Sequence, residues 1–308
     1  MSKTKNITIT VYEIQSTEIS IHNPNLCKDL HNVLNNTESI RERLMPLSKE
    51  SENIDSDFIA NFTLSNDFLF GCFARLKEGE ESVVQKAVLD KKTVSLNEMI
   101  SESKQNTEGS INKSCFFCIH NNLLALSDSQ TMKKAFATYI NWIFEQKNMK
   151  LHYNFVPKKN TTTTISISEI KSIQLSEGFY NLPNDNSFTE TKSKMININK
   201  DEIMKMFLTD VKDMKDFADE ELISATLTLK FNQRKIKKEK ALDTVLNIVD
   251  SDDIVITGKN GKKIKGSEYL IKVKRKIEST SHGLFNEHQI ETEMRTILKK
   301  VENNEIIS

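Results

Sequence analysis

The feature that most limits the fold is a pair of apolar segments around a two-asparagine turn, followed directly by a long amphipathic helix. Residues 114–120 and 123–127 flank Asn121-Asn122, and asparagine tolerates the positive φ of a tight β-turn. From Met132 to Phe144 apolar residues then recur at steps of three and one, a stripe wide enough to cover one face of a sheet. The pattern predicts antiparallel strands with a helix packed on them.

The rest of the chain continues this mixture of period-two and helical spacing. In the first third of the chain we expect a strand around Ile7–Val11, a helix from Asn23 to near Pro46, strands at 58–64, 68–76 and around 83–89, and a polar loop at 101–113. After the long helix we expect strand-like spacing at 165–175 and an acidic helix at 201–217. The last part should contain a strand at 222–232, a helix at 235–249, a strand at 252–257, a turn at 259–261, a long strand at 263–277 and a helix at 286–301. This order predicts an α+β protein with antiparallel sheets, packed helices and two domains.

A boundary is expected after Pro157, where a basic tetrapeptide and a run of four threonines interrupt the pattern. We therefore expect an N-terminal α+β domain at residues 1–157 and a connecting strand and acidic helix at 158–221. A C-terminal basic unit of strand, helix, hairpin and helix should occupy residues 222–308. A chain of 308 residues suits one large or two modest domains.

Composition favours a folded protein of the cytoplasm. The chain is 37% hydrophobic and 28% charged, which is within the globular range. No apolar run approaches the roughly 20 residues of a membrane span, and the N-terminus has no secretory signal pattern. The four cysteines are too few and too unevenly placed for a disulfide framework.

One motif superficially resembles a metal or redox site. Cys115 and Cys118 form a CxxC pair with His120 two positions on. In a strand, residues three apart point to opposite faces, and the chain has no second CxxC pair. We interpret both cysteines as small core residues and expect no metal site.

Other enzymatic patterns also fail. Gly261 and Gly266 have the spacing of a phosphate-binding loop, but the second glycine lacks the following Lys-Ser or Lys-Thr and a strand is expected after it. A metal-dependent nuclease needs an acid on one strand and an acid-x-Lys pair on the next. Asp252 or Asp253 could supply the first acid, yet three residues separate Glu268 from Lys272. We therefore expect a protein that is not an enzyme, with no catalytic residue and no cofactor.

Charge is unevenly distributed along a chain whose net charge is zero. Residues 201–221 contain eight acids and three lysines, a net charge of −5, whereas residues 230–276 contain fourteen Lys/Arg and six acids, a net charge of +8. This asymmetry is typical of a neutral protein with one anion-binding face. The alternative interpretation is a solvated lysine-rich surface.

The basic residues fall into a strand-to-helix passage and a hairpin. The candidate DNA-binding residues are Lys230, Arg234, Lys235, Lys237, Lys238 and Lys240 in the passage, and Lys259, Lys262, Lys263, Lys265, Lys272, Lys274, Arg275 and Lys276 in the hairpin. Alternation with Ile271, Val273 and Ile277 should place Lys272, Lys274 and Lys276 on one strand face. If passage and hairpin lie side by side, they form one stripe that could follow a phosphate backbone.

At the level of pattern, about two thirds of the chain resembles the family of the phage exclusion protein RexA, and more distantly that of the nucleoid protein RdgC. The matching features are Leu229-Lys-Phe231 with Arg234 and Ile236-Lys-Lys238, then Gly261, Tyr269 and Ile290-Glu-Thr-Glu-Met294, and the hairpin Cys118–Leu126 with its helix. The resemblance implies a two-domain α+β homodimer that binds double-stranded DNA with little sequence preference and acts in phage exclusion or prophage regulation. Of the basic residues, it covers Lys230, Arg234, Lys237 and Lys238.

Our first hypothesis is therefore a sequence-tolerant double-stranded DNA-binding protein, nucleoid-associated in the cytoplasm, without a small-molecule cofactor. The second is a soluble interaction subunit that partners a membrane effector, with the acidic helix or the basic face as its docking surface. A metal-dependent nuclease is the third.

Overall fold

The computed structural model describes residues 4–16, 25–47, 55–77, 84–99, 107–127, 130–160, 169–175, 227–230, 254–279 and 285–305. The chain divides into two compact units. Unit 1 combines Met1–Thr162 with Leu270–Ser308, and unit 2 is Thr163–Tyr269. No helix of the described residues is long and apolar enough to span a membrane.

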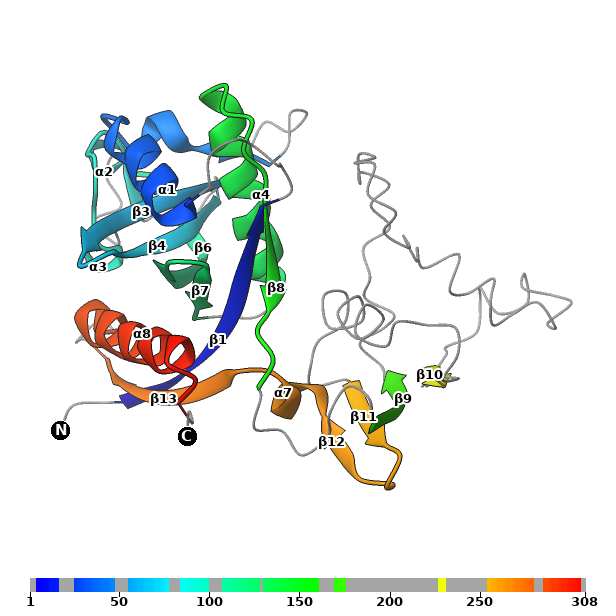
Figure 1. Cartoon of the computed structure of the whole chain (residues 1–308). Coiled ribbons are helices and arrows are strands. Elements are labelled where there is room, and N and C mark those ends of the chain that lie inside the picture. Colours follow the sequence, from blue (N-terminus) through cyan, green and yellow to red (C-terminus); the bar gives the residue numbers. More distant parts are fainter. Residues whose placement is uncertain are drawn as a thin grey trace, which may run out of the picture. The chain divides into compact units, whose positions relative to one another are not determined.

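Unit 1 is built on an antiparallel sheet in the order β13-β1-β7-β6-β4-β3-β2, with β8 also paired to β1 and β5 to β6 (Figure 1). The strands are β1 (Thr4–Ser16), β2 (Met45–Pro46), β3 (Ser56–Ser65), β4 (Phe68–Lys77), β5 (Val84–Gln85), β6 (Thr107–His120), β7 (Leu123–Leu126), β8 (Tyr153–Pro157) and β13 (Lys272–Glu278). The first and the penultimate elements of the chain are thus neighbours, with Thr8 opposite Lys274.

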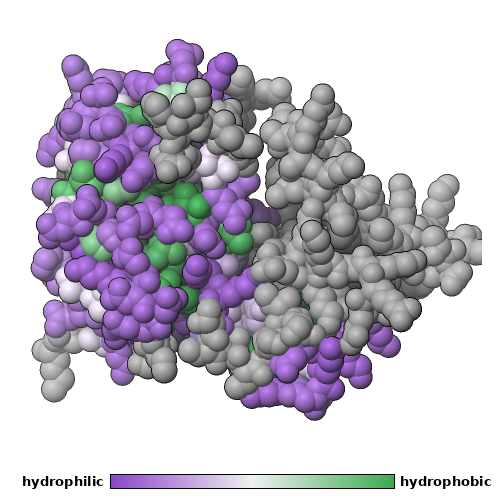
Figure 2. Space-filling view, viewed as in Figure 1, coloured by the Kyte–Doolittle hydropathy of each residue, from purple (hydrophilic) through white to green (hydrophobic). Residues whose placement is uncertain are grey.

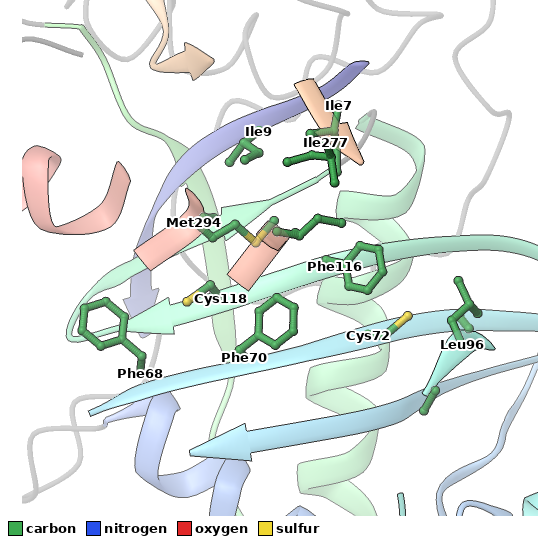
Figure 3. Packing of buried hydrophobic residues seen from close by; sticks show 14 of the residues in the cluster. Ile7, Ile9, Phe68, Phe70, Cys72, Leu96, Phe116, Cys118, Ile277 and Met294 are labelled. Carbon is green, nitrogen blue, oxygen red and sulfur yellow. The ribbon is translucent and has the colours of Figure 1, made fainter. Parts of the chain in front are cut away.

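Helices cover both faces of this sheet. Apolar residues of α1 (Leu26–Asn35) and α4 (Gln130–Gln146) pack on one face, and those of α2 (Lys86–Leu89), α3 (Leu96–Met99) and α8 (Glu287–Glu302) pack on the other. Strand β6 shows why two cores form: Cys115 and Phe117 point into the first, whereas Phe116 and Cys118 point into the second (Figure 3). The α+β class with antiparallel strands and packed helices is confirmed.

The turn chemistry follows the sequence. Asn66, Asp67 and Asn121 have φ values of 49°, 61° and 51°, the left-handed region that asparagine and aspartate enter most readily after glycine. Gly71 is required in β4 by close packing, because a Cβ there would lie 2.5 Å from the carbonyl oxygen of Asn61.

An arginine lies at the centre of unit 1. Arg43, at the end of the 3-10 turn Arg41–Arg43, is fully buried beside the register shift of β3 between Ile59 and Asn61. Its Nε donates to the carbonyl oxygen of Ile59 at 2.8 Å and its Nη1 to Oγ1 of Thr37 at 3.0 Å. The guanidinium therefore supplies a donor to a backbone carbonyl at the irregular point of β3.

Unit 2 holds a four-stranded antiparallel sheet in the order β10-β9-β11-β12. Its elements are β9 (Ile170–Leu175), β10 (Leu227–Lys230), β11 (Ile254–Gly258), β12 (Lys263–Lys265) and the single turn α7 (Gly266–Tyr269). The β11–β12 hairpin turns at Gly261, whose φ is 80°. Ile173, Ile256 and Ile264 are buried on one face of this sheet.

Four predicted elements were wrong in extent or type. The helix expected from Asn23 to near Pro46 ends at Asn35, because Asn36, Thr37 and Ser39 just beyond it are poor helix formers. The region around 83–89 is mostly helix α2, not strand. Residues 107–113 belong to β6, since pairing is made by the backbone and polar side chains do not prevent it.

The long strand expected at 263–277 is interrupted by α7. The buried residues Ile264, Tyr269, Leu270 and Val273 do not share one parity, so a single strand could not bury them all on one face. The break separates the expected C-terminal unit 222–308: β12 lies in unit 2, whereas β13 and α8 lie in unit 1. The predicted helices at 201–217 and 235–249 lie outside the described residues.

Candidate nucleic-acid interface

Five of the predicted basic residues lie in the described part of unit 2, and the side chains of all five are exposed. They are Lys230, Lys259, Lys262, Lys263 and Lys265. The remaining residues of the strand-to-helix passage, Arg234, Lys235, Lys237, Lys238 and Lys240, lie outside the described residues, so the structure tests only the hairpin half of the expected stripe.

Strand pairing places lysines at both ends of one row across the unit 2 sheet. Lys230 is opposite Ser172, Ser172 is opposite Thr257, and Thr257 is opposite Lys263. Directly opposed residues of antiparallel strands lie on the same face. With neighbouring strands about 4.8 Å apart, the Cα atoms of the two lysines are about 14 Å apart. We call the side of the sheet that carries this row and Lys265 the basic sheet face.

The basic sheet face is made of polar and small side chains. Ser172, Gln174, Val255 and Thr257 are partly exposed, and Lys265 lies opposite Val255 in the row beside Lys263. The isoleucines of the same strands are buried on the other side. The sheet is therefore amphipathic, and its cations project from the side that is not its core.

The hairpin turn extends the same strands with two more cations. The backbone N–H of Gly258 donates to the carbonyl oxygen of Lys262 at 2.8 Å, and the side-chain oxygen of Asn260 accepts the N–H of Lys262 at 3.0 Å. The N–H of Lys259 donates to the carbonyl oxygen of Glu169 at 2.7 Å. These bonds fix the backbone of a turn that exposes Lys259 and Lys262. Figure 2, viewed as in Figure 1, shows hydrophilic surface where the β11–β12 hairpin lies.

Within the described residues, no carboxylate forms an ion pair with any of these five predicted lysines. The acid nearest in sequence, Glu268 of α7, accepts the backbone N–H of Lys265 at 3.3 Å. The element that begins at Gly266 is a helical turn and not the expected strand. At its start, the side chain of Glu268 already accepts a backbone hydrogen bond.

The remaining hairpin lysines lie in unit 1. Lys272, Lys274 and Lys276 alternate along β13 as predicted, whereas Val273 and Ile277 are buried against the core that contains α8. Arg275 is on the same side as those apolar residues and pairs through Nε with Oε2 of Glu293 at 3.0 Å. The expected single stripe is therefore two lysine faces, each belonging to its own unit, and Arg275 is on neither.

Neither a family model nor a curated protein sequence matches this chain. The resemblance to the RexA family therefore stays a prediction.

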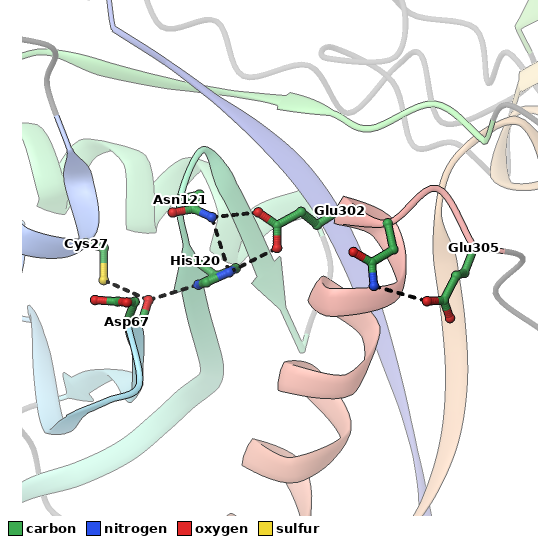
Figure 4. A network of polar contacts seen from close by, with 7 residues as sticks. Cys27, Asp67, His120, Asn121, Glu302 and Glu305 are labelled. Carbon is green, nitrogen blue, oxygen red and sulfur yellow. Dashed lines mark hydrogen bonds and ion pairs between the residues drawn. The ribbon is translucent and has the colours of Figure 1, made fainter.

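The CxxC pair and His120 belong to the framework. Burial raises the pKa of Cys118, and the two cysteines point into different cores. His120 stacks on Phe68 with ring centroids 3.9 Å apart, and its Nε2 lies 3.1 Å from Oε2 of Glu302 (Figure 4). Asn121 also donates to Glu302 at 2.6 Å. The histidine thus joins two hairpin turns to the end of α8.

The described residues offer neither a metal site nor a cavity large enough for a small molecule. No group of three or more His, Cys, Asp or Glu is close enough to hold a metal ion there. A hollow of about 60 Å³ between Lys158, Leu270 and Val301 is far smaller than the roughly 300 Å³ of a small-molecule site. The basic sheet face is the stronger candidate.

Sequence reasoning missed Ser172 and Thr257. Both are uncharged, and Ser172 lies outside the basic segment. The row forms only because β9 pairs with β10 and β11, strands more than 50 residues away in sequence. Only the alternation of Lys263 and Lys265 around Ile264 gave a local signal.

Proposed function

We propose that this protein binds double-stranded DNA with little sequence preference, through the basic sheet face of unit 2. The observation that carries the proposal is the row Lys230–Ser172–Thr257–Lys263, in which exposed lysines without described ion pairs flank two short hydroxyl side chains. Lysines attract phosphates as point charges, and hydroxyl groups are frequent donors to phosphate oxygens.

The composition of the face favours duplex over single-stranded nucleic acid. Proteins that bind single strands stack bases on exposed aromatic side chains, and the described side chains of this face, which include Ser172, Gln174, Val255 and Thr257, contain no aromatic ring. They also contain no arginine, the side chain that most often reads guanine with two parallel hydrogen bonds. A lysine-rich face of this kind contacts the backbone rather than the sequence.

The biological role that we propose is phage exclusion or prophage regulation by a nucleoid-associated homodimer of the cytoplasm. This part rests on the resemblance to the RexA family. A membrane effector as partner belongs to the same proposal. The DNA contact itself rests on the geometry of the face and does not depend on that resemblance.

Band shifts at several salt concentrations test the proposal. Each lysine–phosphate contact contributes about 0.9 to the slope of log affinity against log salt. We expect the combined change Lys230→Glu, Lys263→Glu and Lys265→Glu to lower the slope by about 2.7. A matched control reverses Lys77, Lys147 and Lys150, three exposed lysines of unit 1, and should bind almost as the parent does.

Two results would contradict the proposal. The first is no complex between the parent and a duplex at about 50 mM salt, where phosphate contacts are strong. The second is an equal slope for the variant and the control. In the second case a protein-docking role for the face becomes the better hypothesis.

A further inference from the structure

The structure assigns a second, separate duplex contact to unit 1: the lysine ladder, which we define as Lys272, Lys274 and Lys276 on β13. The inference rests on the proposed function for its ligand, double-stranded DNA. It goes beyond that function because it makes the chain bivalent, with one phosphate-binding face in each unit.

The ladder lies on the side of β13 away from α8. Val273 and Ile277 face the core beneath that helix, so the residues between them face the other way. Lys274 and Lys276 are exposed and Lys272 is partly exposed. Residues two apart on a strand are about 6.8 Å apart, so three cations occupy a line of about 14 Å.

The neighbouring strand leaves room for a partner. The residues of β1 opposite Lys272, Lys274 and Lys276 are Thr10, Thr8 and Asn6, all shorter than lysine and all uncharged. Lys274 and Lys276 therefore extend beyond their neighbours Thr8 and Asn6, whose hydroxyl and amide groups can donate to phosphate oxygens. Thr10, opposite Lys272, is buried. The arrangement repeats that of unit 2, where lysines flank Ser172 and Thr257.

The acids near β13 are engaged elsewhere or lie at its end. Glu293 pairs with Arg275 on the opposite side, and Glu13 pairs with Lys158 at 3.7 Å. Glu278, the last residue of β13, is exposed on the ladder's side. No carboxylate of the described residues forms an ion pair with Lys274 or Lys276, so their charge is available to an external anion.

The density of charge suits a duplex. One DNA strand presents a phosphate for about every 3.4 Å of helix axis, so about four phosphates of one strand fall within the 14 Å of the ladder. Lys274 and Lys276 could neutralise two of them. Loss of two such contacts should lower the salt slope by about 1.8, which is a roughly tenfold change in affinity between 50 and 200 mM salt.

Protection of the sheet edge is the competing explanation. β13 is the last strand of the main path of the sheet, and lysines on an edge strand discourage another chain from pairing there. That role predicts that loss of the lysines causes self-association. It predicts no loss of DNA affinity in protein that stays monodisperse.

Four full-length proteins separate these explanations: the parent, the triple variant of the basic sheet face, the ladder variant Lys274→Glu with Lys276→Glu, and the combination. Short blunt duplexes of unrelated sequence are the probe. We expect the ladder variant to lower the slope by about 1.8 and the combination to lower it by about 4.5. Lys147→Glu with Lys150→Glu is the matched control for charge.

A second ladder variant guards against misfolding at the edge. Lys274→Gln with Lys276→Gln removes both charges without placing acids on β13, and should lose the same slope while it keeps the parent's circular dichroism spectrum and melting temperature. A ladder variant that binds with the parent's slope, while the triple variant does not, overturns the second contact and leaves the proposed function intact. A parent that binds no duplex at low salt overturns both.

Discussion

Replacement of the buried arginine tests how unit 1 is held together. The change Arg43→Met keeps a long unbranched side chain but removes every donor. Besides Thr37 and Ile59, the guanidinium donates through Nη2 to the carbonyl oxygens of Ala60 and Lys92. None of its hydrogen-bond partners in the described residues is a carboxylate, so the charge is held by dipoles and by the ring of Phe62, whose centroid lies 5.5 Å from Cζ.

Two opposing free energies set the size of the effect. Burial lowers the pKa of Arg43 to about 10, and relief of that desolvation would return about 3 kcal/mol. The carbonyl oxygens of Ile59 and Lys92 would lose a charged donor, at about 1–3 kcal/mol each when a buried group is left without a partner. The carbonyl oxygen of Ala60 also loses one, but it keeps the N–H of Val94 at 3.1 Å. The lost hydrogen bonds should dominate, so we expect the free energy of unfolding to fall by about 1–3 kcal/mol.

Urea denaturation followed by circular dichroism measures this change. The control is Arg41→Met, two residues earlier, where the side chain pairs with Asp90 at 2.9 Å with 43% and 63% of the two side chains exposed. Such surface pairs contribute about 0–1 kcal/mol. A loss for Arg43→Met no larger than that for Arg41→Met would refute the reasoning.

Three further predictions concern unit 1. Gly71→Ala should lower the free energy of unfolding by about 1–3 kcal/mol, since the new Cβ would lie 2.5 Å from the Asn61 carbonyl oxygen and 2.6 Å from the Phe117 ring. Thermal melts measure the change, and unchanged stability would show that the strands can separate. Glu287 accepts hydrogen bonds through one oxygen from Asn61 and through the other from the first N–H of α3, and burial raises its pKa. Glu287→Ala should cost about 1–3 kcal/mol, and Glu287→Gln should cost less, because the amide oxygen can still accept one of the two bonds. Equal losses would contradict this. Burial lowers the pKa of Lys133 to about 8. Below about pH 8 the amine is protonated in both the folded and the unfolded chain, so the folded state bears the full cost of a buried charge; between about pH 8 and 10.4 only the unfolded chain keeps the proton, so the free energy of unfolding should rise with pH by up to about 1.4 kcal/mol per pH unit. Lys133→Met should abolish that rise in denaturant titrations.

The local elements were predictable because their signals are local. Asn121 marks its own turn, the stripe from Met132 to Phe144 marks α4, and Asn286 caps α8 by accepting the N–H of Gln289. The opposite orientation of Cys115 and Cys118 followed from strand geometry alone. In each case the residues that form the pattern also form the element.

The tertiary structure alone decided which strands bring their lysines together. Ile264 and Val273 lie in one lysine-rich segment, yet α7 between them sends β12 and β13 to different sheets. Pairing of β13 with β1 joins residues more than 260 positions apart. Period and turn chemistry fix an element, but its partner is chosen by backbone hydrogen bonds and burial across the whole chain, and these leave no mark in a short stretch of sequence.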